Sequence, residues 1–158
     1  MNKYKSYSCK GIVVSLKANF FIVEIDYQYS KEISFDNEQY PPKIRLLCTR
    51  RNRLDYKGLY IDVGDRVLVE SIDFKSRRAV IADLDPRKSF LKRPAVANVT
   101  LIAICISVDE PEFDSEQTSR FLITAECANI KPLVILTKID LIKKNDFDSY
   151  VNKLKDWG

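Results

Sequence analysis

The first 85 residues alternate short apolar runs with short polar breaks, the pattern of successive β-strands. β-branched and aromatic residues dominate these runs, and helical periodicity is weak. The expected strands cover residues 9–17, 20–26, 44–51, 65–74 and 77–85. Five short strands in one stretch of chain predict a small closed β-barrel of the OB-fold class, with an SH3-like barrel as the alternative.

One polar stretch interrupts this series between the second and third strands. Residues 27–43 read YQYSKEISFDNEQYPPK, and the Pro41-Pro42 pair cannot lie in a central strand because proline lacks the backbone donor. We expect an excursion loop here.

A different pattern begins after residue 97. The continuous apolar run VTLIAICIS at residues 99–107 is typical of a strand that is covered on both faces. Asp114 and Gln117 then suit a helix cap ahead of apolar residues at helical spacing. The run PLVILTKID at residues 132–140 contains a second buried strand. Strand, helix and strand with short links predict a parallel βαβ unit.

Helical spacing resumes over residues 146–157, which predicts a second helix. Two buried parallel strands are too few to stand alone, so we expect this unit to be incomplete. Between the two patterns lies the basic connector RKSFLKR. The predicted domains are therefore an OB-fold at residues 1–88, a basic linker at 89–97 and an α/β unit at 98–158.

The composition is that of a soluble globular protein, with 46% apolar and 30% charged residues. Apolar runs are far shorter than the about 20 residues of a membrane span, and the N-terminus lacks the apolar stretch of a secretory signal. We therefore expect no membrane contact and a cytoplasmic location. The chain has no histidine and its four cysteines form no C-x-x-C pair. Metal sites and Ser-His or Cys-His nucleophile pairs are therefore not expected, and the thiols should be reduced and mostly structural.

Charge is distributed unevenly along the chain. Residues 1–95 carry 19 Lys and Arg against 12 Asp and Glu, whereas residues 96–158 carry 7 against 10. A basic first part suggests a polyanionic partner, and OB barrels bind nucleic acid around their second and third strands. Tyr56, Tyr60 and Phe90 lie near the basic clusters and are candidates for stacking on bases. The candidate RNA-binding residues are Arg45, Arg50, Arg51, Arg53 and Lys57 around the third strand, and Arg87, Lys88, Lys92 and Arg93 in the connector.

The tetrad Thr137-Lys138-Ile139-Asp140 directly follows the second buried strand, where parallel sheets bind ligands. Guanine presents two adjacent donors, N1–H and the N2 amino group, and one carboxylate can accept both. Asp140 is the candidate acceptor. The aliphatic stem of Lys138 could lie along the ring, and the Thr137 hydroxyl could fix the loop. These three residues form the candidate guanine site.

A phosphate-binding loop of the form G-x-x-x-x-G-K-[ST] is absent, because none of the four glycines has that spacing. Asp55 and Gly58 match D-x-x-G only formally, since they lie in the basic barrel half. No catalytic residue is therefore expected in this chain. If the nucleotide interpretation holds, the order of elements is permuted and the phosphate-handling parts would follow residue 158.

Three stretches carry a family resemblance: KRPAVANVT at residues 92–100, SRFL at 119–122 and PLVILTKIDLI at 132–142. They resemble the circularly permuted, ribosome small-subunit-dependent GTPases of the RsgA/YjeQ type. The segments Val63-Gly64-Asp65-Arg66-Val67 and Asp85-Pro86-Arg87-Lys88 are similar to the end of that family's OB domain. The chain departs from the family pattern in having Thr137 where Asn is common, and in the long polar excursion.

The resemblance implies an OB domain that contacts 16S-type rRNA of the small ribosomal subunit, followed by the start of a circularly permuted GTPase domain. It also implies GTP or GDP with Mg²⁺ as cofactors of the complete protein, and zinc in a C-terminal segment absent from this chain. The function expected is therefore GTP hydrolysis during late maturation of the small subunit. These 158 residues by themselves are expected to be inactive and to bind guanine nucleotide weakly.

Two alternatives stay open at this point. One is a non-enzymatic OB-fold module that binds RNA, and the other is a truncated, catalytically inactive fragment. We expect a monomer, with self-association through the edges of the incomplete sheet as the alternative.

Overall fold

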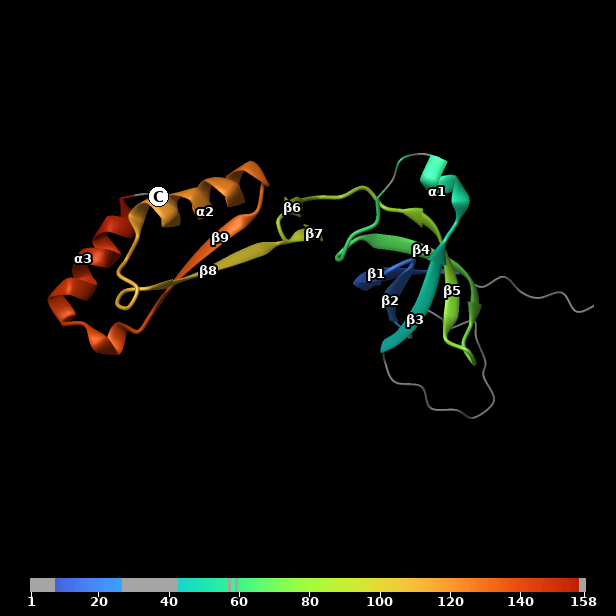
Figure 1. Cartoon of the computed structure of the whole chain (residues 1–158), viewed down its shortest axis with the longest axis horizontal. Coiled ribbons are helices and arrows are strands. Elements are labelled where there is room, and N and C mark those ends of the chain that lie inside the picture. Colours follow the sequence, from blue (N-terminus) through green and yellow to red (C-terminus); the bar gives the residue numbers. More distant parts are fainter. Residues whose placement is uncertain (1–7, 27–42, 57, 59, 157–158) are drawn as a thin grey trace, which may run out of the picture. The chain divides into compact units, whose positions relative to one another are not determined.

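The structure, a computed structural model, describes residues 8–26, 43–56, 58 and 60–156 (Figure 1). The chain divides into two compact units, residues 1–99 and residues 100–158. The predicted excursion loop lies outside the described residues, apart from Lys43. Each unit is described here by itself.

The first unit is built on a closed five-stranded barrel with the strand order β1-β2-β3-β5-β4. All neighbouring strands are antiparallel except β3 and β5, which run parallel. The strands are β1 (Ser8–Lys17), β2 (Phe20–Asp26), β3 (Lys43–Arg50), β4 (Arg66–Asp73) and β5 (Arg78–Leu84). The predicted OB-type barrel of five strands is therefore confirmed.

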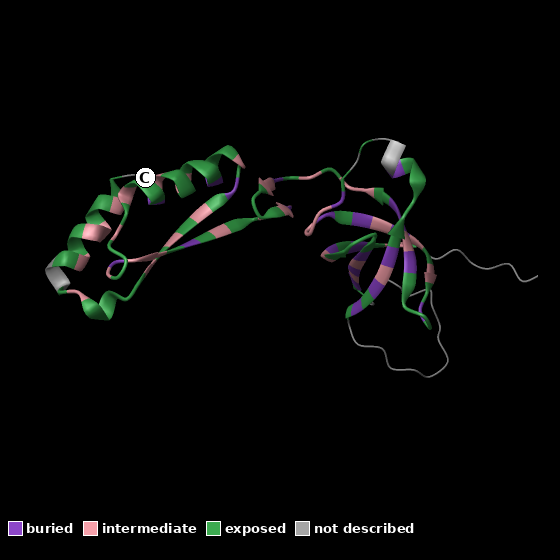
Figure 2. Ribbon diagram, in the orientation of Figure 1, coloured by how far each residue is buried: buried purple, intermediate pink, exposed green. Residues whose placement is uncertain are grey.

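Alternate residues of each strand point into the barrel and form its core, shown as purple bands in Figure 2. Val13, Val23, Leu46 and Ile81 are completely buried there. A short helix, α1 (Asn52–Tyr56), adds Leu54 to this core. The sequence interpretation missed α1, because five residues are too few to show a helical repeat.

The barrel also holds two of the four thiols. Burial raises the pKa of Cys9 to about 11 and that of Cys48 to about 12, so neither is ionised at neutral pH. These two cysteines are structural, as expected. The expectation is wrong for Cys105 and Cys127, which are exposed in the second unit.

Gly11 lets β1 pass close to the barrel core. A Cβ at this position would lie 2.5 Å from Val23 Cγ1 and 2.9 Å from Ile25 Cγ2. We therefore expect Gly11→Ala to destabilise the chain by about 1–3 kcal/mol, the usual cost of overpacking. Urea unfolding followed by circular dichroism measures this, with the exposed neighbour Lys17→Ala as the control. Equal midpoints for the two variants would contradict the clash.

A two-stranded hairpin, β6 (Phe90–Lys92) and β7 (Ala95–Ala97), occupies the stretch predicted as a basic linker. It belongs to the first unit, where Val63 bridges to Val96 and the Ala97 amide donates to the Val63 carbonyl over 2.8 Å. Gly64 permits this approach, since a Cβ there would lie 2.0 Å from the Ala97 oxygen. The domain boundaries at residues 88 and 97 remain predictions.

The second unit contains the predicted parallel βαβ arrangement. Strands β8 and β9 pair in parallel, from Leu101 beside Lys131 to Ser107 beside Thr137. Asp114 caps α2 by accepting from the Gln117 amide over 3.0 Å, as the capping pair predicted. The elements are β8 (Leu101–Ser107), α2 (Ser115–Cys127), β9 (Lys131–Thr137), a 3₁₀ turn (Ile139–Leu141) and α3 (Lys144–Lys155).

One face of the β8–β9 pair stays open among the described residues. Ile104 and Ala125 are buried where α2 packs on the sheet, but Leu101 and Leu133 on the opposite face are 46% and 47% exposed. The expectations that the strand within 99–107 is covered on both faces, and that the strand within 132–140 is buried, are therefore wrong for the described part of the chain. A continuous apolar run shows that both faces of a strand can be buried. It does not show that the described residues cover both faces.

Candidate functional site

The candidate guanine residues lie where β8 and β9 end. Thr137 is the last residue of β9, and its hydroxyl donates to the Ile106 carbonyl of β8 over 3.1 Å. The Val108 amide in turn donates to the Thr137 carbonyl over 3.3 Å. Both bonds tie the two strand ends together, so the following loop starts from a fixed point at the carboxyl edge of the sheet.

Lys138 turns the chain sharply away from this edge. Its backbone is left-handed, with φ 58° and ψ 29°, a conformation that costs a non-glycine residue some free energy. Its Nζ donates to the Glu110 carbonyl, in the loop between β8 and α2. The lysine therefore connects the two loops of this edge, and the position of its stem along a base remains a prediction.

Asp140 lies in the 3₁₀ turn that follows Lys138 and is exposed. Within the described residues, its carboxylate forms no ion pair or hydrogen bond, so both oxygens are open to an external donor pair. The three predicted residues thus share one short loop. Thr137 and Lys138 hold its geometry and Asp140 points its acceptors outward.

Cofactor sites other than this loop are not evident in the described part of the chain. Within the described ranges, no group of three or more Cys, Asp or Glu side chains could hold a metal ion. We therefore assign no metal ion to these residues. No described helix is long and apolar enough to span a membrane.

Three predicted RNA-binding residues lie together at the end of the barrel that carries α1. Arg51 Nη2 pairs with Glu70 at 2.5 Å, and Arg53 donates twice to the Ala82 carbonyl at 3.1 and 2.6 Å. Arg50 is exposed at the end of β3. These contacts hold the guanidinium groups of Arg51 and Arg53 against the barrel.

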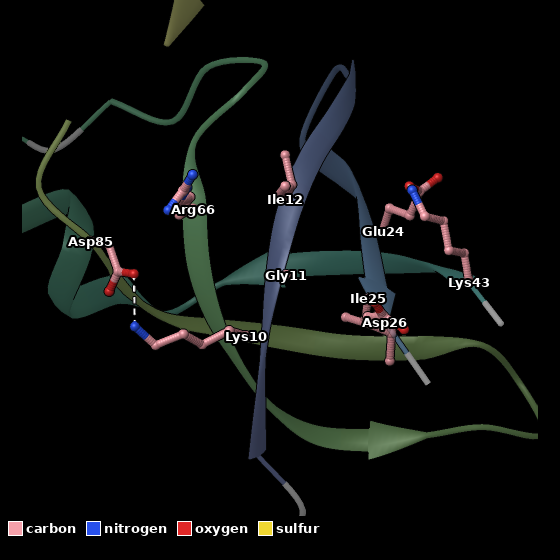
Figure 3. Close-up of a pocket in the computed structure, with 9 residues that line it drawn as sticks. All are labelled: Lys10, Gly11, Ile12, Glu24, Ile25, Asp26, Lys43, Arg66 and Asp85. Atoms are coloured by element: carbon pink, nitrogen blue, oxygen red, sulfur yellow. Dashed lines mark hydrogen bonds and ion pairs between the residues drawn. The ribbon is translucent and has the colours of Figure 1, made fainter. Parts of the chain in front are cut away.

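Arg45 lies at the opposite end of β3 from this group. It shares Glu24 with Lys43, at 3.2 and 3.1 Å respectively, and these bonds lower the pKa of the Glu24 carboxyl. The adjoining pocket, lined by residues of β1, β2, β3 and β4, alternates cations and anions, and Lys10 pairs with Asp85 at 2.8 Å (Figure 3). Because its charges balance, we assign this pocket no polyanionic ligand.

Arg87 was predicted to contact RNA but forms an internal ion pair. Its Nε and Nη2 donate to both oxygens of the completely buried Asp65, at 2.8 and 2.7 Å. It also donates to Asp62 at 2.9 Å and lies 4.3 Å from the ring centroid of Phe90. These bonds raise the pKa of the Arg87 guanidinium and join the hairpin to the barrel. Its side chain is therefore largely occupied inside the first unit.

The remaining predicted RNA-binding residues have different surroundings. Lys88, Lys92 and Arg93 are exposed around the β6–β7 hairpin. Lys57 lies outside the described residues. The RNA contact of the whole set remains a prediction.

Sequence reasoning missed a further basic group in the turn between β4 and β5. Lys75, Arg77 and Arg78 are all exposed there. The run Lys75-Ser76-Arg77-Arg78 is the sequence signal for this group.

Comparisons with known proteins agree with one another. A sequence profile of the family described as RsgA GTPase matches residues 84–158. The chain is 70% identical over 158 residues to a protein of Prochlorococcus marinus strain NATL2A named small ribosomal subunit biogenesis GTPase RsgA, covering all of this chain and 50% of that relative. A protein of the same name from strain MIT 9313 is 45% identical over 149 residues, covering 94% of this chain and 46% of its own length.

The chain is thus similar to RsgA-type GTPases over its whole length. It spans about half the length of the curated relatives it matches. The crystal structure of YjeQ from Thermotoga maritima superposes with a TM-score of 0.74 at 29% identity, over 95% of this chain and 48% of that one.

The fold comparison extends to a more distant relative. The crystal structure of YloQ, a circularly permuted GTPase, gives a TM-score of 0.73 at 20% identity over 99% of this chain and 50% of that one. The resemblance to RsgA/YjeQ-type proteins predicted from residues 92–142 is confirmed. So is the fold class, a closed barrel followed by the parallel βαβ start of a GTPase-like domain.

Proposed function

We propose that this chain supplies the RNA-contacting and guanine-reading parts of a GTPase that acts on the small ribosomal subunit during its late maturation. The observation that carries this proposal is the 70% identity, over the whole chain, to a relative named for small-subunit biogenesis. GTP hydrolysis, with GTP or GDP and Mg²⁺ as cofactors, is proposed for the whole protein. For such a role in ribosome assembly we propose a cytoplasmic location.

Guanine selection is proposed to depend on Asp140. Its exposed carboxylate can accept from N1–H and the N2 amino group of guanine at once, whereas adenine offers no such donor pair. The bond from Thr137 to Ile106 and the bond from Lys138 to Glu110 hold the loop in place. A fixed acceptor loses less entropy on binding than a mobile one.

We do not propose phosphate contacts, which dominate nucleotide affinity, for these 158 residues. The glycines of the chain do not form a G-x-x-x-x-G-K-[ST] loop. We therefore expect guanine binding to be selective but weak, and GTP turnover by the purified chain to be indistinguishable from the background rate. Robust turnover in a phosphate-release assay would contradict this assignment.

Base selectivity provides the direct test of the guanine site. In saturation-transfer NMR, we expect GMP but not AMP to receive signal from the chain. Asp140→Asn exchanges one acceptor for a donor, so it should lower the GMP signal at least about tenfold and favour XMP, whose 2-oxo group accepts. Asp146→Asn in α3 is the matched control and should leave GMP selectivity unchanged. Equal signals from GMP and AMP would refute base recognition by this loop.

The RNA-contacting part of the proposal depends on the barrel. The net charge of residues 1–95 is positive, and exposed arginines and lysines occur at both ends of β3. The partner proposed is 16S-type rRNA within the small subunit, bound by a monomer of this chain. Lys and Arg that neutralise phosphates release counterions, so such binding should weaken steeply with salt.

A non-enzymatic RNA-binding module is the second candidate, favoured by the self-contained core of the barrel. Parallel titrations separate the two. Binding of RNA with no difference between GMP and AMP would support the module, whereas selective GMP binding supports the GTPase portion.

A further inference from the structure

We propose that the β4–β5 turn is a second phosphate-contact site for RNA, formed by Lys75, Arg77 and Arg78. This inference rests on the proposed RNA contact of the barrel and adds a site to it. The site is separate from the group formed by Arg50, Arg51 and Arg53.

The turn presents its cations in a fixed backbone. Asp73 accepts from the amides of Lys75 and Ser76, at 3.0 and 3.2 Å, and from the Ser76 hydroxyl at 2.7 Å. These bonds lower the pKa of the Asp73 carboxyl, which therefore stays ionised and continues to hold the turn. Asp73 is also the cross-strand partner of Arg78 in the β4–β5 pairing, so it offsets part of the positive charge of this turn.

The three cations are available to a partner. All are exposed, and within the described residues none of them forms an ion pair with an acid. The acids nearest in sequence are Asp73, used by the turn, and Asp83, at the far end of β5 and 4.0 Å from Arg53. The tip of the hairpin therefore carries a net positive charge.

Strand pairing places this tip at the end of the barrel opposite α1. Arg78 is level with Leu47 of β3, whose amide donates to the Arg77 carbonyl over 2.8 Å. The β4–β5 turn and the start of β3 lie at the same end of the barrel, and α1 lies at the other (Figure 1). Arg78 is three positions along β3 from the level of Arg50, so the two basic groups are separated by about 10 Å along the strands.

Nucleic-acid phosphate is the ligand chemistry that fits such an arrangement. OB barrels use the loop between their fourth and fifth strands to bind oligonucleotides. Two separated groups of arginine and lysine can engage phosphates at two points of one RNA. An acidic polypeptide would also be attracted, and the experiment below distinguishes it.

The test compares two triple variants of the full chain by fluorescence anisotropy with a short labelled RNA hairpin. The turn variant is Lys75→Gln, Arg77→Gln and Arg78→Gln, and the charge-matched control is Lys131→Gln, Lys153→Gln and Lys155→Gln in the second unit. We expect the turn variant to raise Kd about 10- to 100-fold near 0.1 M salt and to reduce the slope of log K against log salt by about 2–3. The control should change the slope by less than about 0.5.

Two further variants make the outcome decisive. A Lys version of the turn, Arg77→Lys and Arg78→Lys, keeps the charge and should retain RNA binding, which excludes misfolding as the cause of a loss. If neutralising Arg50, Arg51 and Arg53 weakens RNA binding but the turn variant does not, the turn site is refuted and the RNA contact stands. If neither variant changes RNA binding, the proposed RNA contact fails as well. Loss of binding to labelled poly-glutamate with RNA binding unchanged would also refute the turn as an RNA site.

Discussion

Replacing Asp65 with alanine is expected to destabilise the first unit by about 3 kcal/mol, because a buried charge pair loses one partner. For a unit of this size, that corresponds to a melting temperature lower by about 10–20 °C. Most single substitutions at exposed positions change the free energy of unfolding far less than this. Thermal melting followed by circular dichroism measures it.

The size of the effect follows from what the Asp65 carboxylate holds. Its side chain is 0% exposed, and it accepts from two nitrogens of Arg87 and from the Asp62 amide at 2.8 Å. Without it, the Arg87 guanidinium, 27% exposed, keeps only Asp62 and backbone partners. The partial exposure of Arg87 keeps the expected cost at the lower end of the range for broken buried pairs.

A second ion pair of the same barrel provides the control. Lys10 and Asp85 are 2.8 Å apart but 74% and 38% exposed, so Asp85→Ala should cost less than about 1 kcal/mol. The double variant Asp65→Ala, Arg87→Ala should recover part of the loss, because no unpaired guanidinium remains. Equal costs for Asp65→Ala and Asp85→Ala would show that the buried pair does not stabilise the hairpin on the barrel.

The strands of the barrel could be predicted because each one alternates inward and outward residues. In β3, Ile44, Leu46 and Cys48 are buried while Arg45 and Thr49 are exposed, and a period of two is visible in the sequence itself. The same reasoning located Thr137, Lys138 and Asp140 at the end of a strand. Local periodicity and position therefore carried both the fold class and the candidate base loop.

Roles that depend on a distant partner could not be predicted. Arg87 looked like one more cation in a basic connector, but its partner Asp65 lies 22 residues away and only the closed barrel brings them together. Likewise, the run around Cys105 gave no sign that one face of β8 would be open in the described chain. An apolar side chain shows that its position can be buried. Which element covers that position depends on the rest of the fold.

Reversing the charge of Arg50, Arg51 and Arg53 to glutamate is expected to weaken binding to the small ribosomal subunit by at least about 100-fold near 0.1 M salt. With the slope of about 0.7–0.9 per phosphate contact that single-stranded and duplex DNA show, three lost contacts lower log K by about 2–3 near 0.1 M salt before any repulsion is counted. Cosedimentation with purified subunits over a salt series measures both the affinity and the slope. Unchanged pelleting would remove this group from the RNA interface.

Structural damage must be separated from lost contacts in this experiment, because two of the arginines also hold the barrel. Arg51 pairs with Glu70 and Arg53 donates to the Ala82 carbonyl, so their reversal also places acids beside Glu70 and Asp83. Arg50→Glu by itself leaves these two contacts in place, although Arg50 has an interaction of its own, and should lower affinity about tenfold. The Lys triple, Arg50→Lys, Arg51→Lys and Arg53→Lys, keeps the charge but loses the forked bond to Ala82. If the Lys triple binds fully and Arg50→Glu loses affinity, the effect is due to lost phosphate contacts. If the Lys triple loses affinity and Arg50→Glu binds normally, the effect is due to a damaged fold.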